Sequence, residues 1–325
     1  MPEFPGILKR KLLQSLPTVA GILVLNFLLL QQIPGDAVDI MAGEAGGATA
    51  QSMAAMREAY GMEGSMPERL HAYLGNLLRG NLGVSPRFNA PVTTLILERL
   101  PNSLFLVVSG LLLAVVSGIA IGTVMAAFAG RLPDRLLSLL NLVLYSTPGF
   151  WIGLLLILLF SVHLGWLPAN GHATIGVELH GLAWLKDRSW YAVLPIVTVA
   201  TFFIAVYARL TRAAMLEVRN LDFIRTARAK GLHPARITVR HTLRNALIPV
   251  STMAGVHFAA LFGGAAVTET VFGWPGLGRL TLDAVMTRDF HLLLGILLFS
   301  SFVVVAVNIL IDLLQQWLDP RTRTH

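Results

Sequence analysis

The segment Glu217–Pro249 contains the densest set of side chains in this sequence that could do chemistry. It carries six arginines, one lysine and two histidines, but its only acids are Glu217 and Asp222. Acid–base catalysis needs a positioned donor and acceptor, and a metal site needs clustered His, Cys or carboxylate ligands. The segment has neither pattern, so its excess of cations indicates binding to another surface.

The spacing in this segment predicts a short helix, a turn and a second helix. Asp222 falls in the first turn of the expected first helix and Lys230 in its last, an order that complements the helix dipole. Asn220 can cap this helix, and Gly231 can end it because glycine accepts the left-handed backbone conformation. Pro234 suits the start of the second helix. We therefore expect an elbow whose short first arm projects into water.

Two interpretations of the elbow's surface remain open. Arg236, Arg240 and Arg244 recur every four residues, which favours anchoring to anionic lipid or to the membrane interface. In the arm 222–231, small side chains beside the glycine stop favour docking into the cleft of a partner protein.

The composition places most of the chain in lipid. The 325 residues are 55% hydrophobic and 13% charged, with a mean hydropathy of +0.67, whereas soluble domains carry about 25% charged residues. The absence of cysteine excludes disulfides and thiolate chemistry. The basic cluster Lys9–Lys11 precedes an apolar stretch, as in a signal peptide. No small-residue cleavage site follows, which favours an uncleaved signal anchor.

Six apolar segments are long enough to cross a bilayer core of about 30 Å, which needs roughly 20 helical residues. None of the six contains Asp, Glu, Lys or Arg. We therefore predict an all-α polytopic membrane protein with six transmembrane helices. They lie near Leu12–Ile33, Ser103–Phe128, Leu136–Leu164, Trp190–Ala208, Ala246–Thr268 and Leu292–Ile311.

Basic residues gather at one set of helix ends. Besides the elbow, these ends carry Lys9–Lys11, Arg131, Arg135, Arg321 and Arg323. The positive-inside rule therefore predicts that both termini lie in the cytoplasm. This asymmetry also accounts for the net charge of +7 and the pI near 10.2 without any binding to nucleic acid.

The segment 34–102 is then expected outside the membrane, between the first and second transmembrane helices. Ser65 and Glu68 predict the start of an amphipathic helix. Val92–Leu100 is a second amphipathic piece, which leads into the bilayer at Pro101. We expect both pieces to be structured, either along the outer interface or as a cap.

Enzymatic and self-powered functions find little support. The sequence contains no His-Glu-x-x-His, no Gly-x-Ser-x-Gly and no phosphate-binding Gly-x-x-x-x-Gly-Lys motif. Its acids fall in loops, away from the apolar segments. A channel or secondary transporter, a class that often has inverted repeats and midplane ionisable residues, would leave the elbow unexplained and is the more remote alternative.

The elbow carries a resemblance to a known family. The pattern Arg225-Thr-Ala-x-x-x-Gly231, followed after nine residues by His241-x-Leu243, resembles the ATPase-coupling loop of binding-protein-dependent ABC importer permeases. This sequence departs from the general pattern at Arg225, where that pattern has Glu, and at Arg244, where it has Pro.

Longer stretches are similar to the dipeptide/oligopeptide/nickel branch of that family, and together they cover essentially the whole chain. In the elbow, these are Asp222–Leu232 and His241–Pro249. Elsewhere they are Arg10–Leu13, Ile33–Asp36, Ser146–Trp151, Thr268–Arg279, Arg288–Phe290 and Asp319–Arg321.

The resemblance implies a type I ABC importer permease fold and a non-catalytic subunit of the cell inner membrane. Its implied partners are a second homologous permease, two ATP-binding subunits, an extracytoplasmic solute-binding protein and membrane lipid. ATP and Mg would be bound by the partner subunits, and no cofactor by this chain. Short peptides are the favoured solute, partly because Ile40–Glu44 is similar to dipeptide members. Nickel or another metal chelate and glutathione are the alternatives.

The resemblance also assigns residues to the coupling loop, within 217–245. They are Asp222, Phe223, Arg225, Thr226, Ala227, Lys230, Gly231, Arg236, His241 and Arg244. The expected organisation is a cytoplasmic N-terminus with helix 1 (1–33), the outer segment (34–102), a five-helix permease core (103–318) and a cytoplasmic tail (319–325).

Polar residues inside apolar segments usually face a bundle interior, so they are candidates for the translocation path. His257 could line the path or make a helix-to-helix hydrogen bond. Asn141 and Ser146 precede Pro148, which with the next glycine can bend the third segment, either to shape the path or merely to accommodate packing.

Small residues and turn formers mark two further regions. Gly118, Gly122 and Ala126 form a small-xxx-small strip, which predicts a close helix contact within the chain. The glycine-rich stretch after the fifth segment predicts a re-entrant turn, an outer gate or an interface anchor. The candidate gate residues there are Glu269, Trp274 and Gly276.

Overall fold

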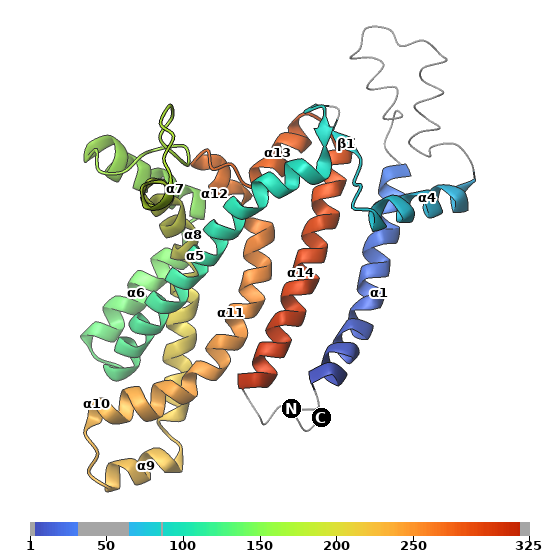
Figure 1. The fold of residues 1–325 in the computed structure, drawn as a ribbon. Helices are drawn as coiled ribbons and strands as arrows, with labels where there is room; N and C mark the ends of the chain where they lie inside the picture. Colours follow the sequence, from blue (N-terminus) through green and yellow to red (C-terminus); the bar gives the residue numbers. More distant parts are fainter. Residues whose placement is uncertain (1–3, 32–64, 86, 319–325) are drawn as a thin grey trace. The chain divides into compact units, whose positions relative to one another are not determined.

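The computed structural model describes residues 4–31, 65–85 and 87–318 (Figure 1). The expectations for 34–64 and for the tail 319–325 lie outside the described residues. The chain forms two compact units, one from residues up to 101 with 279–306 and the other from 102–278 with 307 onward. We call them the first and the second unit.

Helices make up nearly all of the described chain. Those that contribute to the first unit are α1 (Phe4–Gln31), α4 (Met66–Leu78), the start of α5 (Val92–Ala127), most of α13 (Leu277–Met286) and most of α14 (Phe290–Leu318). The second unit contains the rest of α5 with α6 (Leu132–Ser146), α7 (Gly149–Leu156), η1 (Ile157–His163), α8 (Gly181–Val218), α9 (Asp222–Ala229), α10 (Pro234–Arg236), η2 (Ile237–Leu243), α11 (Arg244–Gly264) and α12 (Ala266–Val271). The strands β1 (Val84–Ser85) and β2 (Ala90–Pro91) form one small antiparallel hairpin.

Several helices have the length and composition of membrane spans. Within the described residues, three pass this test: α5, α8 and residues Phe290–Leu310 of α14. A bent pair, α6 followed by α7 and η1, would make a fourth. The first predicted segment keeps a shorter apolar stretch, Leu13–Leu29, and the fifth forms the 21-residue helix α11. The all-helical membrane fold is thus confirmed, while the number six remains a prediction.

The third predicted segment is not one straight helix. Its two halves, Leu132–Ser146 and Gly149–His163, are bent by 103°. Pro148 has no N–H to donate and disfavours the helical conformation at the preceding residue, and Thr147 is accordingly extended at φ −87° and ψ 131°. The predicted bend at Pro148 is therefore confirmed, and the segment near Leu136–Leu164 consists of two helical halves.

The second and fourth segments are longer than predicted. α5 begins at Val92 and continues through Pro101, so the predicted piece Val92–Leu100 forms the first turns of the helix that contains the second segment. A proline costs a helix one hydrogen bond, and burial of apolar side chains such as Ile96 offsets that loss. α8 extends past both ends of the predicted Trp190–Ala208, because the polar residues on either side of this apolar segment are helical as well.

The first unit is held by polar contacts around α1 and α14, which lie side by side (Figure 1). Asn26 donates to the carbonyl of Leu294 and accepts from the hydroxyl of Tyr73, both at 3.0 Å. Burial raises the pKa of Tyr73 to about 12, so it remains a donor at neutral pH. The predicted start of α4 is confirmed by a capping box, in which the backbone N–H of Ser65 donates to Glu68 at 2.7 Å.

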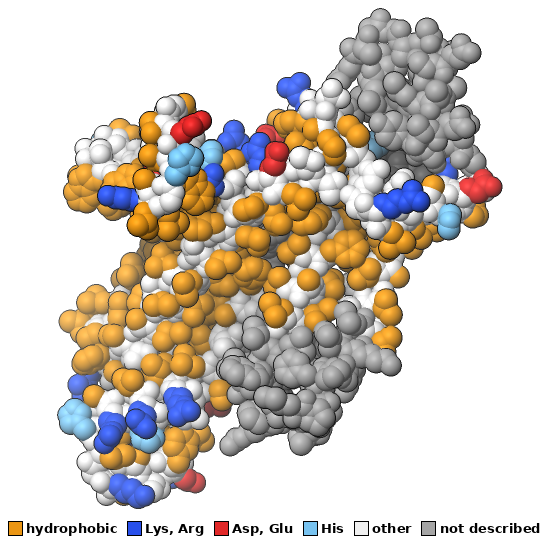
Figure 2. All heavy atoms as spheres, in the orientation of Figure 1, with side chains coloured by type: hydrophobic (Ala, Val, Ile, Leu, Met, Phe, Trp, Pro, Cys, Tyr) orange, Lys and Arg blue, Asp and Glu red, His pale blue; other side chains and the backbone are white. Residues whose placement is uncertain are grey.

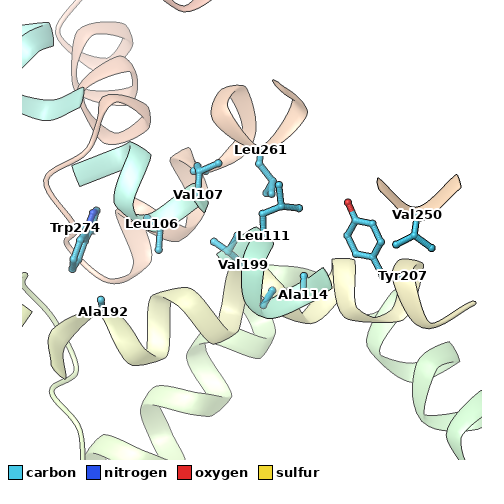
Figure 3. Packing of buried hydrophobic residues seen from close by; sticks show 12 residues of the cluster. Leu106, Val107, Leu111, Ala114, Ala192, Val199, Tyr207, Val250, Leu261 and Trp274 are labelled. Atoms are coloured by element: carbon cyan, nitrogen blue, oxygen red, sulfur yellow. The ribbon is translucent and has the colours of Figure 1, made fainter. Parts of the chain in front are cut away.

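The core of the second unit lies where α5, α8 and α11 meet (Figure 3). Leu111 and Ala114 from α5, Val199 and Tyr207 from α8, and Val250 from α11 are buried together there. Trp274 closes the same cluster near Leu106 and Ala192, as Figure 3 shows.

The predicted small-residue contact within the chain is confirmed between α5 and α8. A Cβ added at Gly118 would lie 2.4 Å from Cβ of Tyr207, and one at Gly122 would lie 2.4 Å from the carbonyl oxygen of Ala208. Real Cβ atoms do not approach this closely, so the two backbones can meet here only because these positions lack side chains.

We expect Gly122→Ala to push α5 away from α8 and to destabilise the protein by about 1–3 kcal/mol, the usual cost of overpacking. Thermal unfolding in detergent, followed by tryptophan fluorescence, measures this effect. Gly21→Ala in α1 is the matched control, because nothing lies within 4 Å of the added carbon there. Equal melting temperatures for the two variants would contradict the close contact.

Candidate functional site

The elbow forms as its spacing predicts. α9 begins at Asp222, ends before Lys230, and is followed by Gly231 in the left-handed conformation at φ +73°. The next helix begins at Pro234. One detail of the prediction is wrong, because Leu221, and not Asn220, occupies the capping position, and its side chain makes no capping hydrogen bond. Packing of the inner face of α9 stabilises the start of this helix in place of a side-chain cap.

The inner face of the elbow is a small apolar core. Ile224 and Ala227 of α9 are buried against Ile237 of η2, and Val218 and Leu232 pack around them. Ala227 therefore holds the arm in place and is not part of its outer surface. Because side chains from both helices of the elbow pack into this core, the arm and the second helix form one body.

The outer face of the arm presents apolar and charged side chains to solvent. Leu221 is 46% exposed and Phe223 is 43% exposed, although both are large and apolar. Asp222 and Arg225 form an ion pair at 3.4 Å, with side chains 94% and 73% exposed, so the pair adds little stability. Thr226 is also exposed, as are Lys230 and Gly231 beyond it.

The second helix of the elbow carries the basic residues. Arg236, Arg240 and Arg244 are exposed, and His241 is half-buried. Figure 2 shows Lys and Arg side chains gathered where α9 and α10 end the molecule, next to a belt of apolar side chains. Residues Ile237–Leu243 form a π-helix, a geometry that is common at functional sites. The arginines suit lipid headgroups and a partner surface equally well.

An ion pair beneath the elbow was not anticipated from the sequence. Arg212 of α8 donates from Nε and Nη2 to the two carboxylate oxygens of Asp134, at 2.7 and 2.8 Å. Asp134 is only 3% exposed and also accepts the backbone N–H of Gly130 at 2.8 Å. Arg219 adds a hydrogen bond to the carbonyl of Ala126 at 2.7 Å. Sequence spacing could not predict these two contacts, because their partners lie 78 and 93 positions apart in the chain.

The polar residues within the apolar helices have partners in packing. Nδ1 of His257 lies 2.9 Å from the hydroxyl oxygen of Tyr207. This distance favours a helix-to-helix hydrogen bond over a position lining the path. Asn141 is buried and donates to Sδ of Met125 at 3.3 Å, and its Oδ1 has no hydrogen-bond partner among the described residues. Ser146 and Pro148 are exposed at the bend between α6 and α7.

Glu269 lies at the centre of the turn that follows α11 and α12. It is fully buried, and its Oε1 accepts the hydroxyl of Ser103 at 2.6 Å. That hydroxyl oxygen in turn accepts the backbone N–H of Leu277 at 2.7 Å. Gly276 leaves room for the carboxylate, since a Cβ there would lie 2.1 Å from Oε1. These contacts fix the turn against α5.

Trp274 fixes the same turn from its other side. Its ring is fully buried, and Nε1 donates to the carbonyl of Asn102 at 3.1 Å. The side chain of Asn102 donates to the carbonyl of Pro275 at 2.9 Å and accepts from Arg188 at 2.6 Å. A buried ring does not suit the interface-anchor interpretation. Asn102, Ser103 and Arg188 could not be identified from the sequence, because their roles depend on contacts between distant segments.

The candidate residues thus fall into separate groups. The residues predicted for the coupling loop lie in the elbow, and Glu269, Trp274 and Gly276 come together in the turn that follows α12, whereas His257 and Asn141 lie in different helix contacts. Among the described residues, no group of three or more His, Cys, Asp or Glu could hold a metal ion.

Comparisons with known proteins agree with this arrangement. Residues 118–324 match the family described as "Binding-protein-dependent transport system inner membrane component". The chain is 37% identical to the "Di/tripeptide transport system permease protein DppB" of Pseudomonas aeruginosa, with 98% of each chain covered. It is 38% identical to the "Glutathione transport system permease protein GsiC" of Pectobacterium atrosepticum (97% of each). It is also 36% identical to the "Oligopeptide transport system permease protein AppB" of Bacillus subtilis, over 96% of this chain and 97% of that one.

A solved structure supports the fold. An inward-facing structure of the MetNI methionine ABC transporter aligns with a TM-score of 0.56 at 18% identity, covering 69% of this chain and 96% of that one. At this identity the likeness concerns the fold alone. The family match and the relatives that are 36–38% identical show that the chain belongs to the family of inner-membrane permease components of binding-protein-dependent transport systems.

Proposed function

We propose that this permease component forms half of an import pathway for short peptides and that its elbow couples the pathway to separate ATP-binding subunits. The observation that carries the coupling role is the arm of α9, which is packed on its inner face yet exposes Leu221 and Phe223. Large apolar side chains on a rigid, solvated arm are typical anchors for a pocket on a partner protein.

The physical requirement for coupling supports this role of the elbow. The permease component is not the ATPase, so the free energy of ATP has to enter through a contact between subunits. A subunit can bias a two-state membrane element only if it grips a part that moves as one body with it. The inner core of Ile224, Ala227 and Ile237 gives the arm this rigidity.

The proposed assembly contains a second homologous permease, two ATP-binding subunits that hold ATP and Mg, and an extracytoplasmic solute-binding protein. The chain would cross the inner membrane six times with both termini in the cytoplasm. The lengths of α1 and α11, together with the basic elbow, support this topology. Arg236, Arg240 and Arg244 would then meet either anionic lipid headgroups or the ATP-binding subunit.

Relatives support short peptides as the solute. The names of similar proteins refer to di- and tripeptides, oligopeptides and glutathione. Glutathione is itself a tripeptide, so one chemistry unites these names: a small solute with charged ends and a peptide backbone. Glutathione and a metal chelate remain the second candidates.

The turn at Glu269, Trp274 and Gly276 would form a rigid wall at the outer end of the pathway. Its two buried hydrogen-bond systems, through Ser103 and through Asn102, support this role. His257, Asn141, Ser146 and Pro148 stay weaker candidates for the path.

Solute specificity is tested first with the assembled complex. We expect co-expression with the neighbouring genes to yield a second permease and ATP-binding subunits. The purified complex should hydrolyse ATP faster with the binding protein and a dipeptide than with glutathione or a nickel chelate. Stronger stimulation by either alternative solute would replace the peptide assignment, and a chain that purifies alone and conducts solute without ATP would contradict the importer function.

Removing an anchor of the arm tests coupling. We expect Phe223→Ala to weaken docking of the ATP-binding subunit by about tenfold, as loss of an interface aromatic typically does, and to reduce solute-stimulated ATP hydrolysis in proportion. Leu132→Ala is the matched control, because that leucine is 68% exposed on another helix. Normal stimulation in the Phe223 variant would rule out the arm as the coupling contact.

Crowding the outer turn tests its role in transport. In Gly276→Ala, the new carbon would displace the Glu269 carboxylate, at a cost of about 1–3 kcal/mol. We expect solute uptake to fall while the ATP-binding subunits remain attached. Gly75→Ala, with open space around the added carbon, is the control. Loss of assembly would instead give the turn a role in folding only.

A further inference from the structure

The ion pair beneath the elbow lies where α8 passes into the arm. Arg212 is six residues before the end of α8 at Val218, about 9 Å along the helix axis at 1.5 Å per residue. Arg219 follows the last residue of α8 directly. Both arginines reach toward the turn between α5 and α6, Arg212 to Asp134 and Arg219 to the carbonyl of Ala126.

We propose that Asp134, Arg212 and Arg219 are positioning residues that make the elbow, α8 and the α5–α6 turn move as one body. This inference rests on the proposed coupling function and names a route by which movement of the arm reaches the membrane helices. We call this set of contacts the clamp.

The geometry of the clamp resists relative rotation. The Asp134–Arg212 pair uses both carboxylate oxygens and two guanidinium nitrogens, so it defines an orientation as well as a distance. The carboxylate also accepts the N–H of Gly130, which ties the backbone of the turn to the same ion pair. Asp134 is 3% exposed and Arg212 is about one-third exposed, with its side chain at 32%, so water screens the pair less than a surface pair.

Apolar packing around the clamp leaves no room for sliding. Ala126 of α5, Ala214 and Met215 of α8, and Ala246 of α11 form a buried cluster of mostly small side chains. One turn earlier in α5, Gly122 touches the backbone of α8. Small, close contacts permit two packed helices to move together and oppose a shift of one along the other.

The clamp is therefore expected to act in transport beyond its effect on stability. If α8 were free to turn against α6, a push on the arm would rotate α8 alone and leave the bent pair of α6 and α7 behind. Basal hydrolysis of ATP would then continue, but the pathway would not move with the arm and solute would not stimulate hydrolysis.

Neutral variants test the clamp in the reconstituted complex. Asp134→Asn and Arg212→Gln should lower solute-stimulated ATP hydrolysis and uptake by about tenfold, within the range of coupling between sites, while basal hydrolysis and subunit composition stay normal. Arg135→Gln, which removes an exposed arginine from the same turn, should match the wild type. Wild-type stimulation is measured first. Its absence would overturn the importer function and this inference together, whereas normal coupling in the neutral variants would overturn this inference alone.

Restoring the link separates positioning from folding. The exchange Asp134→Arg with Arg212→Asp should recover stimulation that each single variant lacks. The chain has no cysteine, so Asp134→Cys with Arg212→Cys can be joined by a short bifunctional thiol reagent. Recovery of uptake on joining supports a clamp that stays closed throughout the cycle. Loss of uptake on joining would overturn it, because that result means the pair must open.

Discussion

The close approach of α5 and α8 is the contact on which the second unit depends. Gly118 and Gly122 have no space for a side chain, so the two backbones touch toward the C-terminal end of each helix. This contact brings Asn102 and Ser103, where α5 enters the second unit, against the turn around Trp274 and Glu269. At the other end it brings Ala126 and the following turn within reach of Arg212 and Arg219. One helix pair therefore connects the turn around Trp274 with the base of the elbow.

Strong polar contacts lie at the ends of this helix pair, and its middle is apolar. The carboxylate of the Asp134–Arg212 ion pair and the Glu269–Ser103 hydrogen bond are both buried, whereas the core between them contains residues such as Leu111 and Val199. Charges cost most at the centre of a bilayer and least near its surfaces, so buried charge at the ends is the less expensive arrangement. This distribution suits a subunit that transmits movement and leaves ATP chemistry to other chains.

Local sequence chemistry predicted those features that depend on neighbouring residues. The elbow follows from Asp222, Gly231 and Pro234, because a dipole, a left-handed turn and a missing N–H each act within one or two helical turns. The break before Gly149 follows from Pro148 in the same way. At Pro101 the helix α5 continues, because packing of the surrounding apolar residues outweighs one lost hydrogen bond, so a proline does not by itself decide whether a helix breaks.

The sequence alone determined that the chain is a helical membrane protein with a polar elbow and with motifs that resemble those of a family of membrane permeases. These properties depend on apolar length, charge placement and short motifs, which can be counted along the chain. Only the tertiary structure decided that Ala227 faces inward, that His257 pairs with Tyr207, and that Asp134 meets Arg212. Each of these depends on which faces of distant helices meet, and helix packing angles follow from the shapes of many side chains together.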